Sequence, residues 1–153
     1  MTERNAGRAM LRWASGIMIT LGAGHLALLT VFLWSDVSAW AERGLWAAVP
    51  LQLDNTGLTV AELSNEVTFW AGPGSFSVPL VVLGALVWNL AGRGVAVPAW
   101  VGWVLAAWCL VSGILLVPSP YFVGVVAGLL VVLAARRGRA RAAEGGTRPT
   151  VSA

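Results

Sequence analysis

Long stretches without a charged side chain are the dominant feature of this sequence. They cover Trp13–Ser35, Val67–Gly92 and Gly94–Ala135, which contain 23, 26 and 42 residues. A helix that crosses the hydrocarbon core of a bilayer needs about 20 apolar residues. The first two runs therefore supply one crossing each, and the third is long enough for two.

The composition excludes the other broad classes of protein. Hydrophobic residues make up 58% of the chain and charged residues 11%, with a mean hydropathy of +0.77, whereas a soluble domain carries about 25% charged residues. Cys109 is the single cysteine, so an internal disulfide or a cysteine-built zinc site is impossible. These numbers exclude a soluble domain, a disordered chain and a disulfide scaffold, and they leave a bilayer protein.

The predicted fold is an all-α integral membrane protein, a bundle of four transmembrane helices. A proline pair in Val117–Pro120 divides the longest run, and no alternation of period two indicates a β-barrel. We expect a cytoplasmic N-terminus at 1–12, one transmembrane domain at 13–137 and a disordered cytoplasmic tail at 138–153. The spans are expected at 13–34, 74–91, 98–117 and 121–136.

The arginines predict the orientation of these spans. In a four-span arrangement Arg43 lies on one side of the membrane and the other nine arginines lie on the opposite side. This asymmetry favours cytoplasmic termini, because positive charge accumulates on the cytoplasmic side. The basic residues stand beside apolar runs, which indicates a topology signal and not a nucleic-acid-binding face. All are arginine, as is typical of a GC-rich bacterium, so the expected location is a bacterial plasma membrane.

A cleaved signal peptide is the competing interpretation of the N-terminus. The three arginines before residue 13, the apolar run and Val37-Ser38-Ala39 are similar to such a leader. The apolar run is longer than the usual 7–15 residues, however, and its removal would put the arginine-rich tail against the charge rule. We therefore favour an uncleaved first span.

The segment 36–66 is the one sizeable piece expected outside the membrane. A short helix lying in the interface plane is predicted by an apolar face at helical spacing, which contains Val37, Trp40, Ala41, Gly44, Leu45 and Ala48. Pro50 is expected to end this helix. A turn at 54–57 precedes one or two further helical turns at 58–66, with weak capping by Thr56-x-x-Thr59.

His25 is the first candidate for chemistry, because it stands near the middle of the first span. An ionisable group at that depth is costly and is a functional hypothesis by default. The functional alternatives are proton relay, ligand contact and an interhelical hydrogen bond. The structural alternative, which we favour, is a neutral ring bonded to a backbone carbonyl or to a polar side chain on a neighbouring helix.

A second candidate cluster stands at the expected external end of the second span. Its ligand-binding candidates are Asn65, Phe69, Trp70 and Phe76, and Glu66 is its candidate acid or base. A carboxylate beside an aromatic wall and a Gly-Pro-Gly hinge could bind a cation or have a raised pKa. The simpler alternative, again favoured, leaves Glu66 in water and makes Trp70 an interfacial anchor.

Small residues predict where the helices pack. Gly124-x-x-x-Gly128 and similar stripes allow close approach of helix backbones, either within the bundle or in a homo-oligomer. One histidine and one cysteine cannot assemble a transition-metal site, and no nucleotide-binding or hydrolase motif is present. We therefore expect no metal and no cofactor, with the lipid bilayer as the main partner.

Several stretches resemble an uncharacterised family of small four-span membrane proteins from high-GC bacteria. They are Gly22-Ala23-Gly24-His25, the stretch FWAGPGSF at 69–76, Val78-Pro79-Leu80, residues 97–103 and Pro118-Ser119-Pro120. The resemblance covers 12–137. It implies the four-helix fold and transfers no activity.

The predicted function is that of a non-catalytic accessory or lipophile-binding membrane bundle. Two alternatives stay open. One is a small membrane isomerase or cyclase for a lipophilic substrate that uses His25 or Glu66, and the other is a proton-coupled exporter with a path past His25. The enzyme requires one of these groups to face a pocket of roughly 300 Å³ or more.

Overall fold

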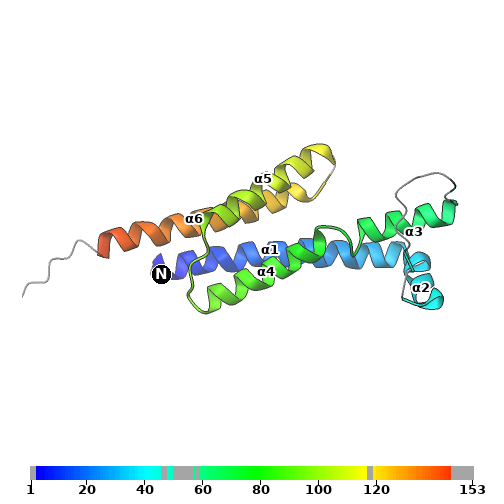
Figure 1. Cartoon of the computed structure of the whole chain (residues 1–153). Helices are drawn as coiled ribbons and strands as arrows, with labels where there is room; N and C mark the ends of the chain where they lie inside the picture. The colour runs from blue at the N-terminus through cyan, green and yellow to red at the C-terminus, as the bar shows by residue number, and fades with distance from the viewer. Residues whose placement is uncertain (1–2, 46–47, 50–56, 58, 117–118, 146–153) are drawn as a thin grey trace, which may run out of the picture. The chain divides into compact units, whose positions relative to one another are not determined.

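The chain is all-helical in the computed structural model, which describes residues 3–45, 48–49, 57, 59–116 and 119–145. This confirms the predicted all-α class. The helices of the described part are α1 Glu3–Phe32, α2 Trp34–Arg43, α3 Val60–Ala71, α4 Ser77–Gly92, α5 Ala99–Leu115 and α6 Tyr121–Gly145 (Figure 1).

The chain divides into two compact units. One contains residues 1–19 and 82–153, here called the arginine unit, and the other contains residues 20–81, here called the acidic unit. The boundaries fall inside α1 and α4, so each of these helices contributes residues to both units.

Four helices are strongly apolar. Asn5–Phe32 and Tyr121–Ala140 are long and apolar enough to cross a membrane, while Ser77–Gly92 and Ala99–Leu115 are shorter apolar helices. The α1 helix starts ten residues before the predicted first span, because the sequence from Glu3 onward contains no proline and is rich in good helix formers.

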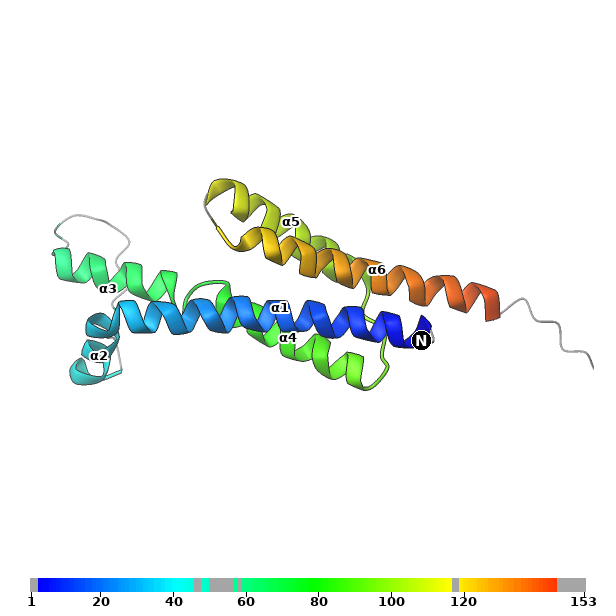
Figure 2. The same ribbon diagram turned by 180° about the vertical axis from the view of Figure 1, so that it is seen from behind.

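In the arginine unit, α5 and α6 form an antiparallel hairpin. The two helices lie side by side in opposite views of the ribbon (Figures 1 and 2). The small residues of α5 form its packed face, since Gly102, Ala106, Cys109 and Gly113 are all buried. The proline pair that was expected to break the helices lies partly outside the described residues, as 117–118 are not described.

The α6 helix continues through Gly145, eight residues into the segment that was expected to be a disordered tail. Alanine and arginine dominate this extension, and both have high helix propensity. The remaining residues of the predicted tail, 146–153, lie outside the described residues.

In the acidic unit, two short helices occupy the expected external segment. The predicted first helix is α2, which ends at Arg43 and not at Pro50, a residue outside the described part. The second is α3, which contains the one or two turns predicted at 58–66 in part and continues five residues beyond them to Ala71. Thr59 caps it by a capping box, in which the Thr59 hydroxyl accepts from the Glu62 backbone N–H and the Glu62 carboxylate accepts from the Thr59 N–H. Thr56, the other predicted capping residue, is not described.

Candidate ligand pocket between α2 and α3

The polar side chains of α3 hold it against α2. Thr68 is buried, and its hydroxyl donates to Asp36 Oδ2 at 3.0 Å. The Ser64 hydroxyl, one turn earlier on α3, donates to the same oxygen at 3.0 Å. Asp36 stands in the first turn of α2, where a carboxylate also interacts favourably with the helix dipole. One carboxylate therefore joins the beginning of α2 to two turns of α3.

Asn65 makes the second connection between these segments. Its side chain is 3% exposed; its amide oxygen accepts a hydrogen bond from the indole Nε1–H of Trp40, and its amide nitrogen donates to the carbonyl oxygen of Ala48 at 2.8 Å. A buried side-chain amide needs partners for both its donor and its acceptor. Asn65 thus holds the Trp40 ring and the chain at Ala48 in defined positions.

Three aromatic rings pack against one another beside this hydrogen bond. The Trp40 and Phe69 rings meet edge to face with centroids 6.5 Å apart and an angle of 64° between the planes. Phe69 meets Trp70 in the same manner, at 5.2 Å and 77°. Edge-to-face pairs of this kind stabilise by about 0.5–1.5 kcal/mol beyond their buried area, so Phe69 is held on both sides.

A cavity of about 310 Å³ lies against these rings. Its described lining has no titratable group and consists of Trp40, Leu45, Ala48, Val49, Phe69 and Pro73. Its walls come from α2, from the chain that follows α2, from α3 and from the proline after α3. We call it the aromatic pocket.

His25 lies elsewhere in the acidic unit. Its Nε2 atom is 2.9 Å from the carbonyl oxygen of Ala71, the last residue of α3. This contact is the bond to a backbone carbonyl that the structural alternative predicted. It satisfies an orphan carbonyl at a helix end. The catalytic and ligand-binding roles of His25 stay predictions.

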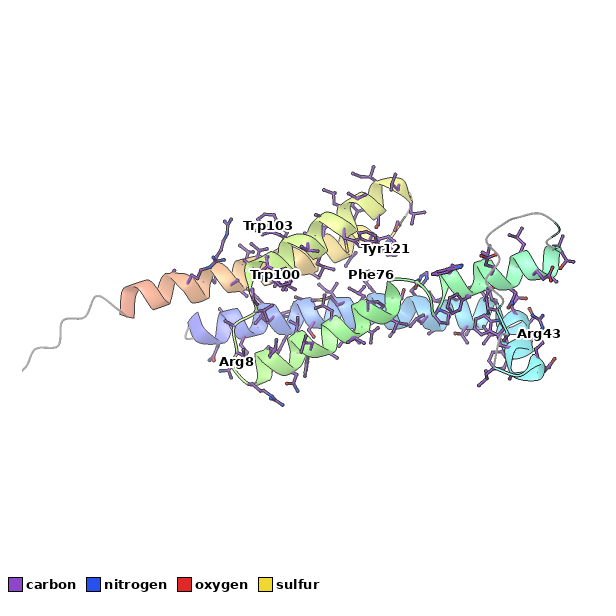
Figure 3. All side chains as sticks on the ribbon, in the orientation of Figure 1. Arg8, Arg43, Phe76, Trp100, Trp103 and Tyr121 are labelled. Carbon is purple, nitrogen blue, oxygen red and sulfur yellow. The ribbon has the colours of Figure 1, made fainter. Side chains whose placement is uncertain are left out.

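The other predicted site residues divide into two groups. Asn65 and Phe69 belong to the aromatic pocket, as an anchor of its wall and as a lining residue. Glu66, Trp70 and Phe76 are not part of the described lining. Trp70 is 54% exposed, Glu66 is half-buried, and Phe76 is half-buried in the segment that leads into α4 (Figure 3).

Among the described side chains, Glu62 is a carboxylate of the acidic unit whose pKa is lowered. The cause is the capping box, in which the backbone N–H and then the hydroxyl of Thr59 donate to the carboxylate. Both bonds favour the charged form. No group of three histidine, cysteine, aspartate or glutamate side chains in the described part of the chain could hold a metal ion.

A family model matches residues 9–139, which is most of the chain. The chain belongs to DUF6463, a family of unknown function. The match covers the whole stretch 12–137 over which the sequence resembles an uncharacterised family. Neither a curated protein nor a solved structure matches the chain.

Several pocket residues were not predicted as site residues from the sequence. Trp40, Leu45 and Ala48 were noted only as one face of an expected interfacial helix, and Val49 and Pro73 carried no prediction of binding. The predicted face was a partial signal. Trp40, Leu45 and Ala48 line the pocket although the helix ends before Leu45, whereas Val37, Ala41 and Gly44 of the same face do not belong to the described lining. The bond between Trp40 and Asn65 had no such signal.

Proposed function

We propose that this DUF6463 chain is an integral protein of a bacterial plasma membrane. In this proposal it crosses the bilayer four times with both termini in the cytoplasm, and it binds a small lipophilic molecule in the aromatic pocket without transforming it. The aromatic pocket is the single observation that carries the binding role.

The packing of the apolar side chains supports membrane residence. The α5 helix buries Gly102, Ala106 and Cys109 but leaves Trp103, Trp108 and Leu115 between 50% and 76% exposed. A helix in water does the reverse and buries its largest apolar side chains. Small residues inside and large apolar residues outside are the pattern of helices packed in lipid.

The partition of charge supports the proposed orientation. The arginine unit contains nine arginines with Glu3 and Glu144 as its acidic residues, whereas the acidic unit contains Arg43 with five acidic residues. An excess of arginine over acidic residues is typical of the loops and termini on the cytoplasmic side of a membrane.

The chemistry of the aromatic pocket supports binding of a lipophile. Ligand sites are concave and mostly apolar, with a small number of polar groups. The described lining of the pocket is wholly apolar apart from the Trp40 indole, whose N–H donates to Asn65. A ligand that brought a charge into this pocket would lose its hydration without gaining a partner.

Enzymatic and exporter roles receive less support. Neither His25 nor Glu66 is part of the described lining of the aromatic pocket, and the alternative of an isomerase or cyclase requires one of them there. The alternative of an exporter also depends on His25, whose Nε2 is engaged by the Ala71 carbonyl.

Photolabelling of the full chain in liposomes tests the binding role. The probe is 3-azioctanol, a small lipophilic alcohol that carries a diazirine. We expect its adducts to concentrate on the peptides that contain Trp40 and Phe69. Ala48→Leu fills the pocket and should reduce those adducts by about tenfold, which corresponds to about 1.4 kcal/mol of binding free energy.

Ala41→Leu is the matched control for this variant. Ala41 is exposed on α2, so the same added volume stays outside the pocket and should leave labelling at its original level. Adducts spread evenly over all exposed apolar side chains, or equal labelling of the two variants, would show that the pocket binds no lipophile.

Cysteine accessibility tests the membrane arrangement separately. In a Cys109→Ala background, Arg43→Cys should react with a membrane-impermeant maleimide added outside intact cells. Arg139→Cys should react only after the cells are opened. Reaction of both variants from outside would contradict the proposed topology, whatever the aromatic pocket binds.

A further inference from the structure

The arginine unit contains a cavity of about 420 Å³ with positive charge on three of its walls. Arg8 comes from α1, Arg93 from the turn that follows α4 and Arg137 from α6. Arg8 is labelled in Figure 3. Arginines from three segments that are more than 40 positions apart in the sequence thus line one basin, which we call the arginine basin.

The charges of the arginine basin have no described counter-ion. No carboxylate occurs among the described side chains of the arginine unit, since 5–19 and 82–140 contain no aspartate or glutamate. Arg137 donates to the Met10 sulfur at 3.4 Å, a contact that does not neutralise the guanidinium charge. Like charges that lie close together repel one another, so binding of an anionic ligand would stabilise the arginine basin.

The backbone around Arg93 is held by a defined helix end. The Gly94 N–H donates to the Ala91 carbonyl at 3.3 Å, and the Val95 N–H donates to the Leu90 carbonyl at 2.9 Å. Gly94 has a φ of +72°. These are the bonds and the left-handed glycine of a Schellman motif. The motif ends α4 at Gly92 and places Arg93 at the beginning of the turn that follows, so the arginine basin is partly built by this turn.

A second cavity of about 530 Å³, apolar in its lining except for Arg139, adjoins the arginine basin; we call it the apolar cavity. The two cavities share Ala96, Val97, Ala135 and Gly138 as wall residues. The second cavity is lined further by Pro98, Ala99, Trp100 and Arg139. Trp100 is 66% exposed, and an exposed indole is typical of the membrane–water interface.

We propose that the arginine basin and the adjoining apolar cavity together bind one anionic phospholipid. The phosphate is held by the planar forks of the guanidinium groups, which match phosphate oxygens in pairs. The glycerol and the beginning of the acyl chains lie against the apolar cavity and Trp100. A free phosphate would use only the basin, so the apolar neighbour favours the lipid as the source of the anion.

This inference depends on the proposed membrane residence, and it is independent of the aromatic pocket. Basic pockets on the cytoplasmic side of helical bundles bind anionic headgroups for the same electrostatic reason. An arginine near an anionic surface raises the binding constant by about fivefold. We therefore expect each single arginine substitution to lower lipid binding by this factor.

Native mass spectrometry of the full chain in detergent tests the proposal. The probes are dioctanoyl phosphatidylglycerol, dioctanoyl phosphatidylcholine and inorganic phosphate, offered singly and in competition. We expect the phosphatidylglycerol adduct to exceed the phosphatidylcholine adduct by about tenfold or more. Each of Arg8→Gln, Arg93→Gln and Arg137→Gln should lower the phosphatidylglycerol adduct by about fivefold.

Matched variants distinguish the loss of a basin arginine from other effects of a substitution on the protein. Arg43→Gln removes an arginine from the acidic unit and should leave the adduct unchanged. Arg137→Lys keeps the charge but loses the planar fork, so its binding should lie between that of the unmodified chain and that of Arg137→Gln. Trp100→Ala should weaken phosphatidylglycerol without affecting inorganic phosphate, because only the lipid uses the apolar cavity.

Three results would overturn the proposal. They are equal binding of the two phospholipids, an adduct that survives the three glutamine substitutions made together, and binding of inorganic phosphate as tightly as phosphatidylglycerol. Loss of photolabelling at the aromatic pocket with intact phosphatidylglycerol binding would contradict only the proposed function. If the glutamine variants fail to fold, the lipid preference of the unmodified chain and the Trp100→Ala comparison still decide the question.

Discussion

Gly102 on α5 and Gly128 on α6 pack backbone against backbone. A β-carbon added to Gly102 would lie 2.5 Å from the carbonyl oxygen of Gly128, and one added to Gly128 would lie 2.6 Å from the carbonyl oxygen of Gly102. Gly124 is also buried. The stripe that was predicted to pack either within the bundle or between copies is therefore used within the chain, and a homo-oligomer through it or other small-residue faces stays a prediction.

Gly128→Ala should destabilise the chain by about 1–3 kcal/mol, because the added methyl group overpacks a contact that has no room for it. Gly138→Ala is the matched control on the same helix, where an added β-carbon meets nothing within 4 Å. The control should be neutral or stabilising by about 0.5–1 kcal/mol, since glycine is a poor helix former. Thermal unfolding in detergent measures both, and equal midpoints would contradict this packing.

Asn65→Leu should loosen Trp40 and the chain at Ala48 from α3 in the acidic unit, while Asp36 still joins α2 to Ser64 and Thr68. The substitution leaves the Trp40 indole N–H and the Ala48 carbonyl without their partner, and each buried unsatisfied group costs about 1–3 kcal/mol. In NMR spectra, the indole N–H proton of Trp40 should lose the downfield chemical shift that its hydrogen bond to Asn65 causes. Ser64→Ala removes one exposed hydrogen bond on the same helix and is expected to change stability by less than about 1 kcal/mol. An unaltered Trp40 resonance in Asn65→Leu would refute the assignment.

His25 should carry its proton on Nε2 when the ring is neutral. A carbonyl oxygen accepts and never donates, so the contact with Ala71 requires the N–H at this nitrogen. The ¹⁵N shifts of a histidine-labelled sample distinguish the two tautomers. Detection of the Nδ1–H tautomer would contradict the contact.

His25→Phe keeps the ring and removes the hydrogen bond. If the role of His25 is structural, the variant should lose about 0.5–1.5 kcal/mol of stability and keep the photolabelling of the aromatic pocket. A variant that folds with unchanged stability and loses labelling would instead support a functional histidine.

The start of α3 should weaken in acid. The capping box lowers the pKa of Glu62, so its stabilisation is complete above the ordinary glutamate pKa and is lost as the pH falls through the lowered value. A ¹³C titration of the Glu62 carboxyl group measures this directly. Thr59→Ala removes a donor and should move the pKa back up, whereas Thr30→Ala, at a threonine that bonds the Leu26 carbonyl in α1, should leave it unchanged. A Glu62 titration that is identical in the two variants would exclude the capping box.

The helical class was predictable because it depends on local properties of the chain. The uncharged runs, the proline pair and the face shared by Trp40, Leu45 and Ala48 are each read from neighbouring residues. Helix ends were less predictable. The α6 helix extends to Gly145 because alanine and arginine continue it, although the loss of apolar character suggested a tail.

The candidate site was only half predictable. Phe69 and Asn65 were named because an aromatic residue and a polar residue at a span end are informative by themselves. The partner Trp40 stands 25 residues before Asn65, and no spacing rule relates two segments that are joined by a long connection. His25 was recognised from its depth in an apolar run, but its bond to Ala71, 46 residues away, was not.

The sequence alone determined that the chain is helical and that several of its helices are strongly apolar, because both properties follow from the residues of each local stretch. Only the tertiary structure decided that Asn65 orients Trp40 beside a pocket and that Arg8, Arg93 and Arg137 surround one basin. The reason is physical. Hydrogen bonds, ring contacts and shared cavities depend on distances in space, and the chain connects these residues through segments whose path local preferences do not specify.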